Sequence, residues 1–118
     1  MSSSEQSLKD KVFSSSPAQL ILLLMDAAVE ALATADGKYC AAAYDEAIPF
    51  IDKARQITEE LHRSVKPDVG ELSVNMQTVY TSINVQLDKA VMQKDVSALE
   101  NALRMMSELR DTWKTISR

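Results

Sequence analysis

Histidine, cysteine and glycine are scarce in this chain, and their scarcity excludes several kinds of chemistry. The 118 residues include one His, one Cys and two Gly. A catalytic triad or a Cys–His pair would rest on His62 or Cys40 alone, without recognisable partner residues. No pair of His or Cys residues offers metal ligands, and two isolated glycines form no phosphate-binding loop. We therefore expect no enzyme, no metal site and no cofactor.

Disulfides, long apolar runs and a basic charge balance are also lacking. A lone cysteine forms no intrachain disulfide, which favours a reducing compartment. The longest apolar run, Leu20–Met25, is far shorter than the ~20 residues that span a bilayer. Residues 1–7 lack the pattern of a secretory signal, and the net charge of -4 disfavours binding to nucleic acid. We expect a cytoplasmic protein without a nucleic-acid partner and without membrane insertion.

The residues that are plentiful favour helix. Ala, Leu, Lys, Glu, Gln and Met have high helix propensity, and no segment alternates apolar and polar residues as a strand does. A chain of 118 residues has the usual size of a single domain that buries its own core. The sequence therefore predicts one all-α domain.

The first long helix is predicted to begin at Ser16–Gln19, where Ser16 caps, Pro17 suits the first helical position and Gln19 completes a capping box. Its end is less clearly marked. Asp36–Gly37 has the composition of a helix stop, whereas the residues after it favour helix. Pro49 is tolerated best near a helix start, which favours a second helix beginning near Tyr44 or Asp45. The turn is then expected near residues 41–44.

Three further helices follow at helical spacing of apolar residues. The second ends before Lys66–Pro67, and the third follows a capping box formed by Asp68 and Glu71. Asp95 is predicted to cap the fourth. The third stripe is the most regular: Leu72, Met76, Val79, Tyr80, Ile83, Leu87 and Ala90. The fourth helix is predicted to bury Leu99, Ala102, Leu103, Met106, Leu109, Trp113 and Ile116.

Four amphipathic helices with short links predict an antiparallel up-down four-helix bundle over residues 14–118. Residues 1–13 are expected to be a flexible arm, whose Leu8, Val12 and Phe13 could form a short helix or a strap across one end of the bundle. Among single residues, Cys40 is interpreted as a small core filler, and Tyr80 as a core aromatic. His62 admits a phosphotransfer bundle as an alternative, because such domains use one histidine on a helix.

Four segments resemble the FliS family of flagellar secretion chaperones, in the family's order and at similar spacing. Ser14–Leu24 resembles its Ser-Pro-x-x-Leu-Ile-x-Leu-Leu segment, and Lys53–Leu61 its Lys-Ala-Gln-x-Ile-x-x-Glu-Leu helix. Gly70–Met76 is similar to its Gly-Glu-Ile-x-x-Asn-Leu, and Leu109–Lys114 to its terminal Arg-Asp-x-Trp-Lys. Together the four segments lie between residues 13 and 116.

The resemblance implies a non-catalytic bundle that binds the disordered C-terminal segment of flagellin, prevents its premature polymerisation and delivers it to the export gate. Such a chaperone is a monomer or a weak homodimer. The expected contacts lie on the second and third helices: Ile57, Leu61, Met76, Val79, Tyr80 and Ile83. Leu8, Val12 and Phe13 are expected to cap a groove until the substrate arrives.

Residues 80–87 depart from the family's Tyr-Asp-Tyr-Met-x-Arg-Arg-Leu, since only Tyr80 and Leu87 match it. A tyrosine that the family places early in the arm falls near Ser3 here. A divergent flagellin or another flagellar export substrate therefore stays open as the partner. A homodimerising structural adaptor is a further alternative, beside phosphotransfer through His62.

Overall fold

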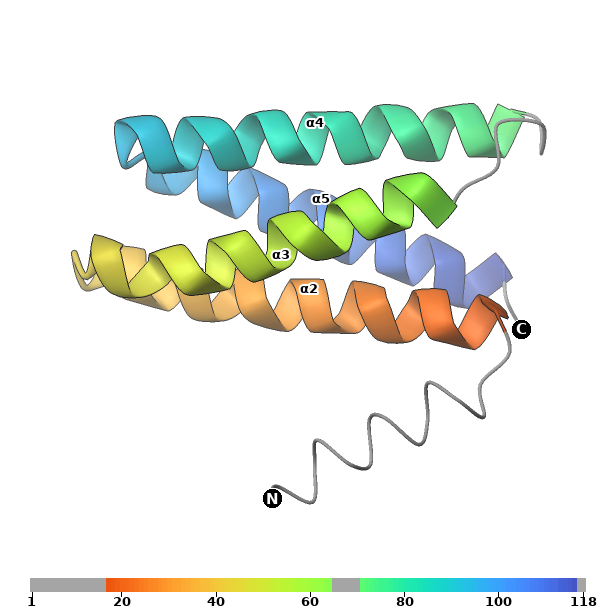
Figure 1. Ribbon diagram of the computed structural model, residues 1–118, viewed down its shortest axis with the longest axis horizontal. Coiled ribbons are helices and arrows are strands. Elements are labelled where there is room, and N and C mark those ends of the chain that lie inside the picture. Colours follow the sequence, from red (N-terminus) through yellow and green to blue (C-terminus); the bar gives the residue numbers. More distant parts are fainter. Residues whose placement is uncertain (1–16, 65–70, 117–118) are drawn as a thin grey trace, which may run out of the picture.

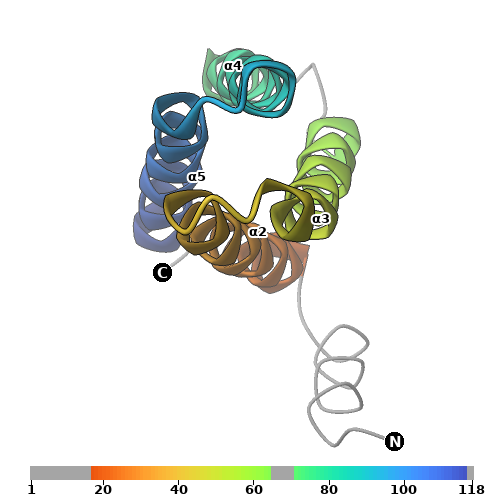
Figure 2. The same ribbon diagram turned by 90° about the vertical axis from the view of Figure 1, so that its left-hand side faces the viewer.

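Four helices make up the residues that the computed structural model describes, 17–64 and 71–116. They are α2 (Pro17–Cys40), α3 (Tyr44–Ser64), α4 (Glu71–Gln93) and α5 (Val96–Ile116), with no strand in this part of the chain. Each runs antiparallel to the next (Figure 1). Figure 2 shows the helices closing a ring in chain order, with α4 diagonal to α2. The predicted up-down four-helix bundle is confirmed, whereas the N-terminal arm and strap lie outside the described residues.

The core lies along the axis of the bundle, where each helix places one apolar stripe. On α2 this stripe is rich in alanine: Ala28, Ala31 and Ala35 are buried. Small side chains let helix axes approach closely, and α2 and α3 form the most closely packed neighbouring pair. Between α3 and α4 the packing is loosest. The largest fully buried side chains are Tyr80, Met25, Leu32, Ile51, Leu61, Ile83, Leu87, Leu99, Met106 and Thr58.

The turn between α2 and α3 is a Schellman motif built without glycine. The amide of Ala43 donates to the Lys38 carbonyl at 2.8 Å, and the amide of Ala42 donates to the Tyr39 carbonyl at 3.0 Å. Ala42 occupies the left-handed position, with a φ of 58°. The turn lies where it was predicted, but α2 continues through Gly37, so the interpretation of Asp36–Gly37 as a possible stop is wrong.

The turn between α4 and α5 uses the same device and is only two residues long. Lys94 takes the left-handed position with a φ of 50°, and the Asp95 amide donates to the Ala90 carbonyl at 3.1 Å. Asp95 also begins α5, because its carboxylate accepts a hydrogen bond from the Ala98 amide at 3.2 Å. The predicted cap at Asp95 is thus confirmed. The same residue ends α4 through its backbone amide and caps the N-terminus of α5 through its side chain.

The interpretation of Cys40 as a core filler is wrong, because its thiol side is exposed. Cys40 is the last residue of α2, and Tyr39 beside it occupies the inward position instead. The Tyr39 hydroxyl donates to the Ala90 carbonyl at 3.0 Å, and its ring meets Tyr44 edge-on at 5.0 Å. Adjacent helical residues point about 100° apart, so the inward position of Tyr39 turns Cys40 toward the side of the stripe, where it is exposed.

Replacing Ala42 by glycine is expected to raise the free energy of unfolding by up to about 1 kcal/mol. A left-handed φ costs an L-residue roughly 1–2 kcal/mol and costs glycine little, which outweighs the greater chain entropy of glycine in the unfolded state. Urea denaturation at pH 7 measures the change. As a matched control, Ala33→Gly makes the same replacement at an exposed position inside α2 and should lose about 1 kcal/mol. A loss in both variants would contradict the strained turn.

Candidate binding pocket between α4 and α5

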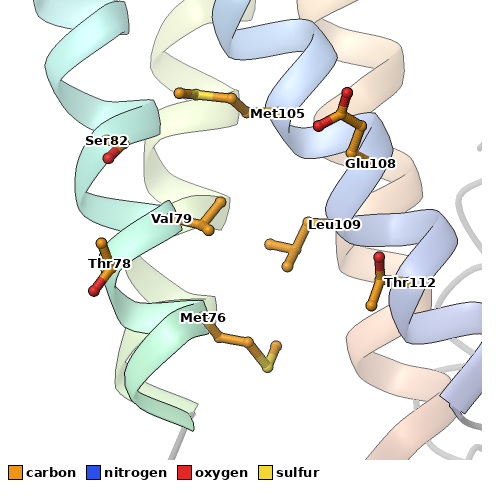
Figure 3. A pocket seen from close by; sticks show the side chains of 8 residues that line it. All are labelled: Met76, Thr78, Val79, Ser82, Met105, Glu108, Leu109 and Thr112. Atoms are coloured by element: carbon orange, nitrogen blue, oxygen red, sulfur yellow. The ribbon is translucent and has the colours of Figure 1, made fainter. Parts of the chain in front are cut away.

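A pocket of about 350 Å³ opens on the surface between the first half of α4 and the last half of α5 (Figure 3). Eight side chains line it: Met76, Thr78, Val79, Ser82, Met105, Glu108, Leu109 and Thr112. The helical spacing of these residues explains how the pocket forms. On α5, Met105, Leu109 and Thr112 follow one another at four and three residues and therefore share a face. On α4, Val79 and Ser82 turn the same way toward α5.

The interior of the pocket is apolar and its rim is polar but uncharged, apart from one carboxylate. Figure 3 shows Val79 and Leu109 pointing toward one another across the opening, with Met76 below and Met105 above them. The two methionines have long unbranched side chains that adapt to a guest of irregular shape. Hydroxyl groups of Thr78, Ser82 and Thr112 surround this centre, and Glu108 is exposed beside them. The pocket suits an apolar side chain of a partner.

The surface of α4 next to the pocket carries no charge over four turns. Residues 72–87 contain no Asp, Glu, Lys or Arg. Thr78, Thr81 and Val85 are exposed along this stretch. An exposed helix face in a soluble domain usually carries charged residues. A neutral face beside an apolar pocket is instead typical of a surface that another chain covers.

The six predicted contact residues fall into two groups in the structure. Met76 and Val79 line the pocket, and Ile57 on α3 is partly buried against the core. Leu61, Tyr80 and Ile83 are fully buried, so a partner cannot reach them while the helices stay packed. The predicted cap residues Leu8, Val12 and Phe13 lie outside the described residues, and their role stays a prediction.

The α5 side of the pocket was not predicted as a binding surface. Leu109 was assigned to the buried stripe of the fourth helix, yet it is only partly buried and forms one wall of the pocket. A signal was present in the sequence: Met105, Leu109 and Thr112 continue the α5 stripe to one side, which makes it wider than a core requires. Such a broad stripe indicates a second apolar contact in addition to the core.

Tyr80 and His62 pack against each other across the loose seam between α3 and α4. Their ring centroids are 6.1 Å apart with planes tilted by 40°. Tyr80 is fully buried, which confirms the interpretation of this residue as a core aromatic. Burial raises the pKa of the Tyr80 hydroxyl above its usual value, because the ionised form loses its hydration. The half-buried ring of His62 thus has a packing role that accounts for it without phosphotransfer.

Removing the hydroxyl of Tyr39 is expected to lower the free energy of unfolding, whereas removing that of Tyr80 is not. The Tyr80 hydroxyl is buried and has no hydrogen-bond partner among the described residues, whereas Tyr39 donates to Ala90. Tyr39→Phe should therefore lose about 1 kcal/mol of unfolding free energy at pH 7, and Tyr80→Phe should lose none. Equal losses in urea denaturation would contradict the unpaired hydroxyl.

The raised pKa of the buried Tyr80 hydroxyl also leads us to expect that the free energy of unfolding falls at alkaline pH. Its pKa is raised in the folded state, so its contribution is complete below the unfolded-state value of about 10 and falls as the pH rises above it. Tyr39 shares this direction, because desolvation and then Tyr44 raise its pKa. Tyr80→Phe should flatten the fall of unfolding free energy between pH 9 and 11, as measured by urea denaturation. An unchanged slope would contradict the buried phenol.

The chain matches the family described as flagellar protein FliS over residues 1–118. The chain belongs to the FliS family. It is also similar to the flagellar secretion chaperone FliS of Salmonella typhimurium, with 30% identity over 118 aligned residues that cover 94% of this chain and 84% of the relative. FliS proteins are not a family of enzymes.

Two of the FliS-like segments supply walls of the pocket. Gly70–Met76 contributes Met76, and Leu109–Lys114 contributes Leu109 and Thr112. The third and fourth FliS-like segments thus meet on one face of the bundle, although Met76 and Leu109 lie more than 30 residues apart in the chain. Within the described residues, no cluster of His, Cys, Asp and Glu is suited to hold a metal ion, and no helix is long and apolar enough to cross a membrane.

Proposed function

We propose that this chain is a cytoplasmic export chaperone that binds the disordered, amphipathic C-terminal segment of flagellin or of a related flagellar export substrate. Binding prevents premature polymerisation, and the complex delivers the segment to the flagellar type III export apparatus. Membership of the FliS family and the name of the Salmonella typhimurium relative support this role. The single observation in the structure that carries it is the apolar pocket between α4 and α5.

The chemistry of the pocket fits a segment that folds as it binds. A disordered chain that becomes an amphipathic helix places apolar side chains at spacings of three, four and seven residues along one face. One such side chain enters between Val79 and Leu109, and its neighbours lie on the neutral surface of α4. No charge on this part of α4 has to lose its hydration when the segment covers it.

Among the predicted contact residues, Ile57 and Val79 are partly exposed to a bound segment. Met76 is only 5% exposed, and a segment would reach it through the pocket that it lines. The buried residues of the predicted set support this surface from the core, where they fix the positions of α3 and α4: Leu61, Tyr80 and Ile83. The proposal therefore keeps the predicted set but divides it between direct contact and support. Leu109 and Met105 join the direct contacts from α5.

Co-purification tests the proposal with the C-terminal segment of flagellin from the same organism. The tagged chain and the segment are expressed together and purified through the tag, and the complex is measured by size-exclusion chromatography with light scattering. A stable one-to-one complex supports the proposal. If no complex forms with flagellin or with the other filament and cap proteins of that organism, the proposed function is wrong.

A further inference from the structure

The exposed apolar side chains of α4 lie on one line with the pocket. Val85 is 56% exposed and Met92 is 82% exposed, and these are the exposed large hydrophobic residues in the described part of the chain. They are seven residues apart, so they lie on the same face of the helix. Thr78 lies seven residues before Val85 and lines the pocket. Val85 is therefore midway between the edge of the pocket and the exposed Met92 side chain.

This spacing makes the α4 face complementary to itself. When two copies of a helix pair antiparallel about a two-fold axis through Val85, each residue faces the one equally far on the other side of Val85. Met92 then faces Thr78 of the partner subunit, beside the pocket. A long flexible side chain on each copy meets an apolar pocket of about 350 Å³ on the other.

We propose that the α4 face of Thr78, Val85 and Met92 is the interface of a homodimer in which Met92 of each copy enters the pocket of the other. Residues 72–87 bring no like charges together at this interface, because they carry none.

The charges at the two ends of the face support the same arrangement. Glu108 is exposed beside the pocket, and Lys89 is exposed one turn before Met92 on the side of α4 that faces α5. A two-fold axis perpendicular to antiparallel helices places the α5 sides of both copies together. Lys89 therefore comes to the level of Glu108 of the partner subunit. Among the described residues, the Lys89 ammonium group lies 3.8 Å from the Asp95 carboxylate, and an exposed contact of this length is weak enough to be exchanged for Glu108 of the partner subunit.

The extent of the face predicts a weak dimer. α4 has 23 residues and is about 34 Å long, and a single helix pair buries less than the roughly 1,200 Å² of a standard stable interface. The dissociation constant is expected to be micromolar or weaker. If the proposed function holds, substrate and second copy compete for one pocket, so that free chaperone covers its own apolar surface until an export substrate displaces the partner.

Disulfide trapping tests the two-fold axis directly. Exposed Cys40 is first replaced (Cys40→Ser), and single cysteines are introduced and oxidised with copper phenanthroline. Val85→Cys should cross-link to itself because it lies on the axis. Met92→Cys and Thr78→Cys should cross-link when the two variants are mixed but not when each is alone. Thr34→Cys on α2, the helix diagonal to α4, is the exposed control and should stay monomeric. Absence of the Val85→Cys dimer, or equal trapping at residue 34, overturns the proposal.

Sedimentation velocity over a range of concentrations tests the contact without cysteines. Met92→Asp should weaken self-association by at least about tenfold, whereas Thr34→Asp should leave it unchanged. A wild-type chain that stays monomeric near 1 mM overturns the proposal. A dimer that appears only after removal of residues 1–13 also overturns it, because the arm then covers this face. Neither measurement contains a substrate segment, so failure of the dimer and failure of the proposed function are separate results.

Discussion

Replacing Ile83 by alanine is expected to lower the free energy of unfolding by about 2–5 kcal/mol. Ile83 is fully buried at the centre of the α4 stripe, where it packs in the core between α4 and the other helices. Truncation removes three carbon atoms and leaves a cavity that rigid helix backbones fill only in part. For a domain of this size the loss is a large share of its whole stability. Urea denaturation followed by circular dichroism at pH 7 measures it.

Val85 on the same helix provides the matched comparison. It lies two residues after Ile83, is also β-branched, and is 56% exposed. Val85→Ala should change the unfolding free energy by no more than about 0.5 kcal/mol in dilute monomer. Similar losses at residues 83 and 85 would show that α4 is not oriented as described. Tyr80 is as fully buried as Ile83, so a charge placed there is expected to unfold the bundle, and Tyr80→Asp would therefore report on folding and not on substrate binding.

The four helices and their order could be predicted because each signal is local. Asp95 supplies a capping carboxylate directly before an apolar stripe, and the structure confirms that cap. The turn after α2 was placed correctly although its left-handed position is taken by Ala42 and not by glycine. Pro49 fixed the start of α3 only approximately, since it lies in the second turn of a helix that begins at Tyr44. There it is exposed, so water can reach the carbonyl of Asp45 that loses its intrahelical donor.

Gly37 and Cys40 show where local signals fail. Gly37 lies inside α2, and apart from the adjoining backbone of that helix no described atom lies within 4 Å of the place where a Cβ would stand, so no packing requirement calls for glycine there. A glycine inside a helix costs roughly 0.5–1 kcal/mol, which the packing of α2 against α3 and α5 easily exceeds. Cys40 is exposed because Tyr39 beside it takes the inward position at the end of α2. Both outcomes depend on how α2 packs against its neighbours, which a sequence window does not contain.

The binding pocket was only half predicted for a related reason. Helical periodicity identifies a stripe but not the neighbour that each edge of the stripe meets. Met76 and Val79 were predicted as contacts and line the pocket, whereas Tyr80 and Ile83 in the same stripe point into the core. The distinction depends on the rotation of α4 about its axis. That rotation is set by packing against α5, whose wall of the pocket became visible only in the folded arrangement.

Val79→Asp is expected to weaken binding of the flagellin segment by at least about tenfold, and by more if the pocket holds a fully buried apolar side chain. Val79 is partly exposed in the free chain, so an aspartate there keeps its hydration and the fold survives. A bound segment would cover that carboxylate with apolar groups and remove its water. Leu109→Asp, on the opposite wall, should act in the same way. Isothermal titration calorimetry with the purified segment measures both affinities.

Thr34→Asp adds the same charge at an exposed position of α2, a helix that contributes no side chain to the pocket, and should leave the affinity unchanged. Circular dichroism and urea denaturation must show that each variant remains folded, because only then does a change of affinity report on the surface. If Val79→Asp and Leu109→Asp bind like the wild type, the substrate lies elsewhere, and the seam between α3 and α4 next to Ile57 becomes the surface to examine. If only Val79→Asp loses affinity, the segment runs along α4 without entering between the two helices, since a side chain in the pocket must touch both walls.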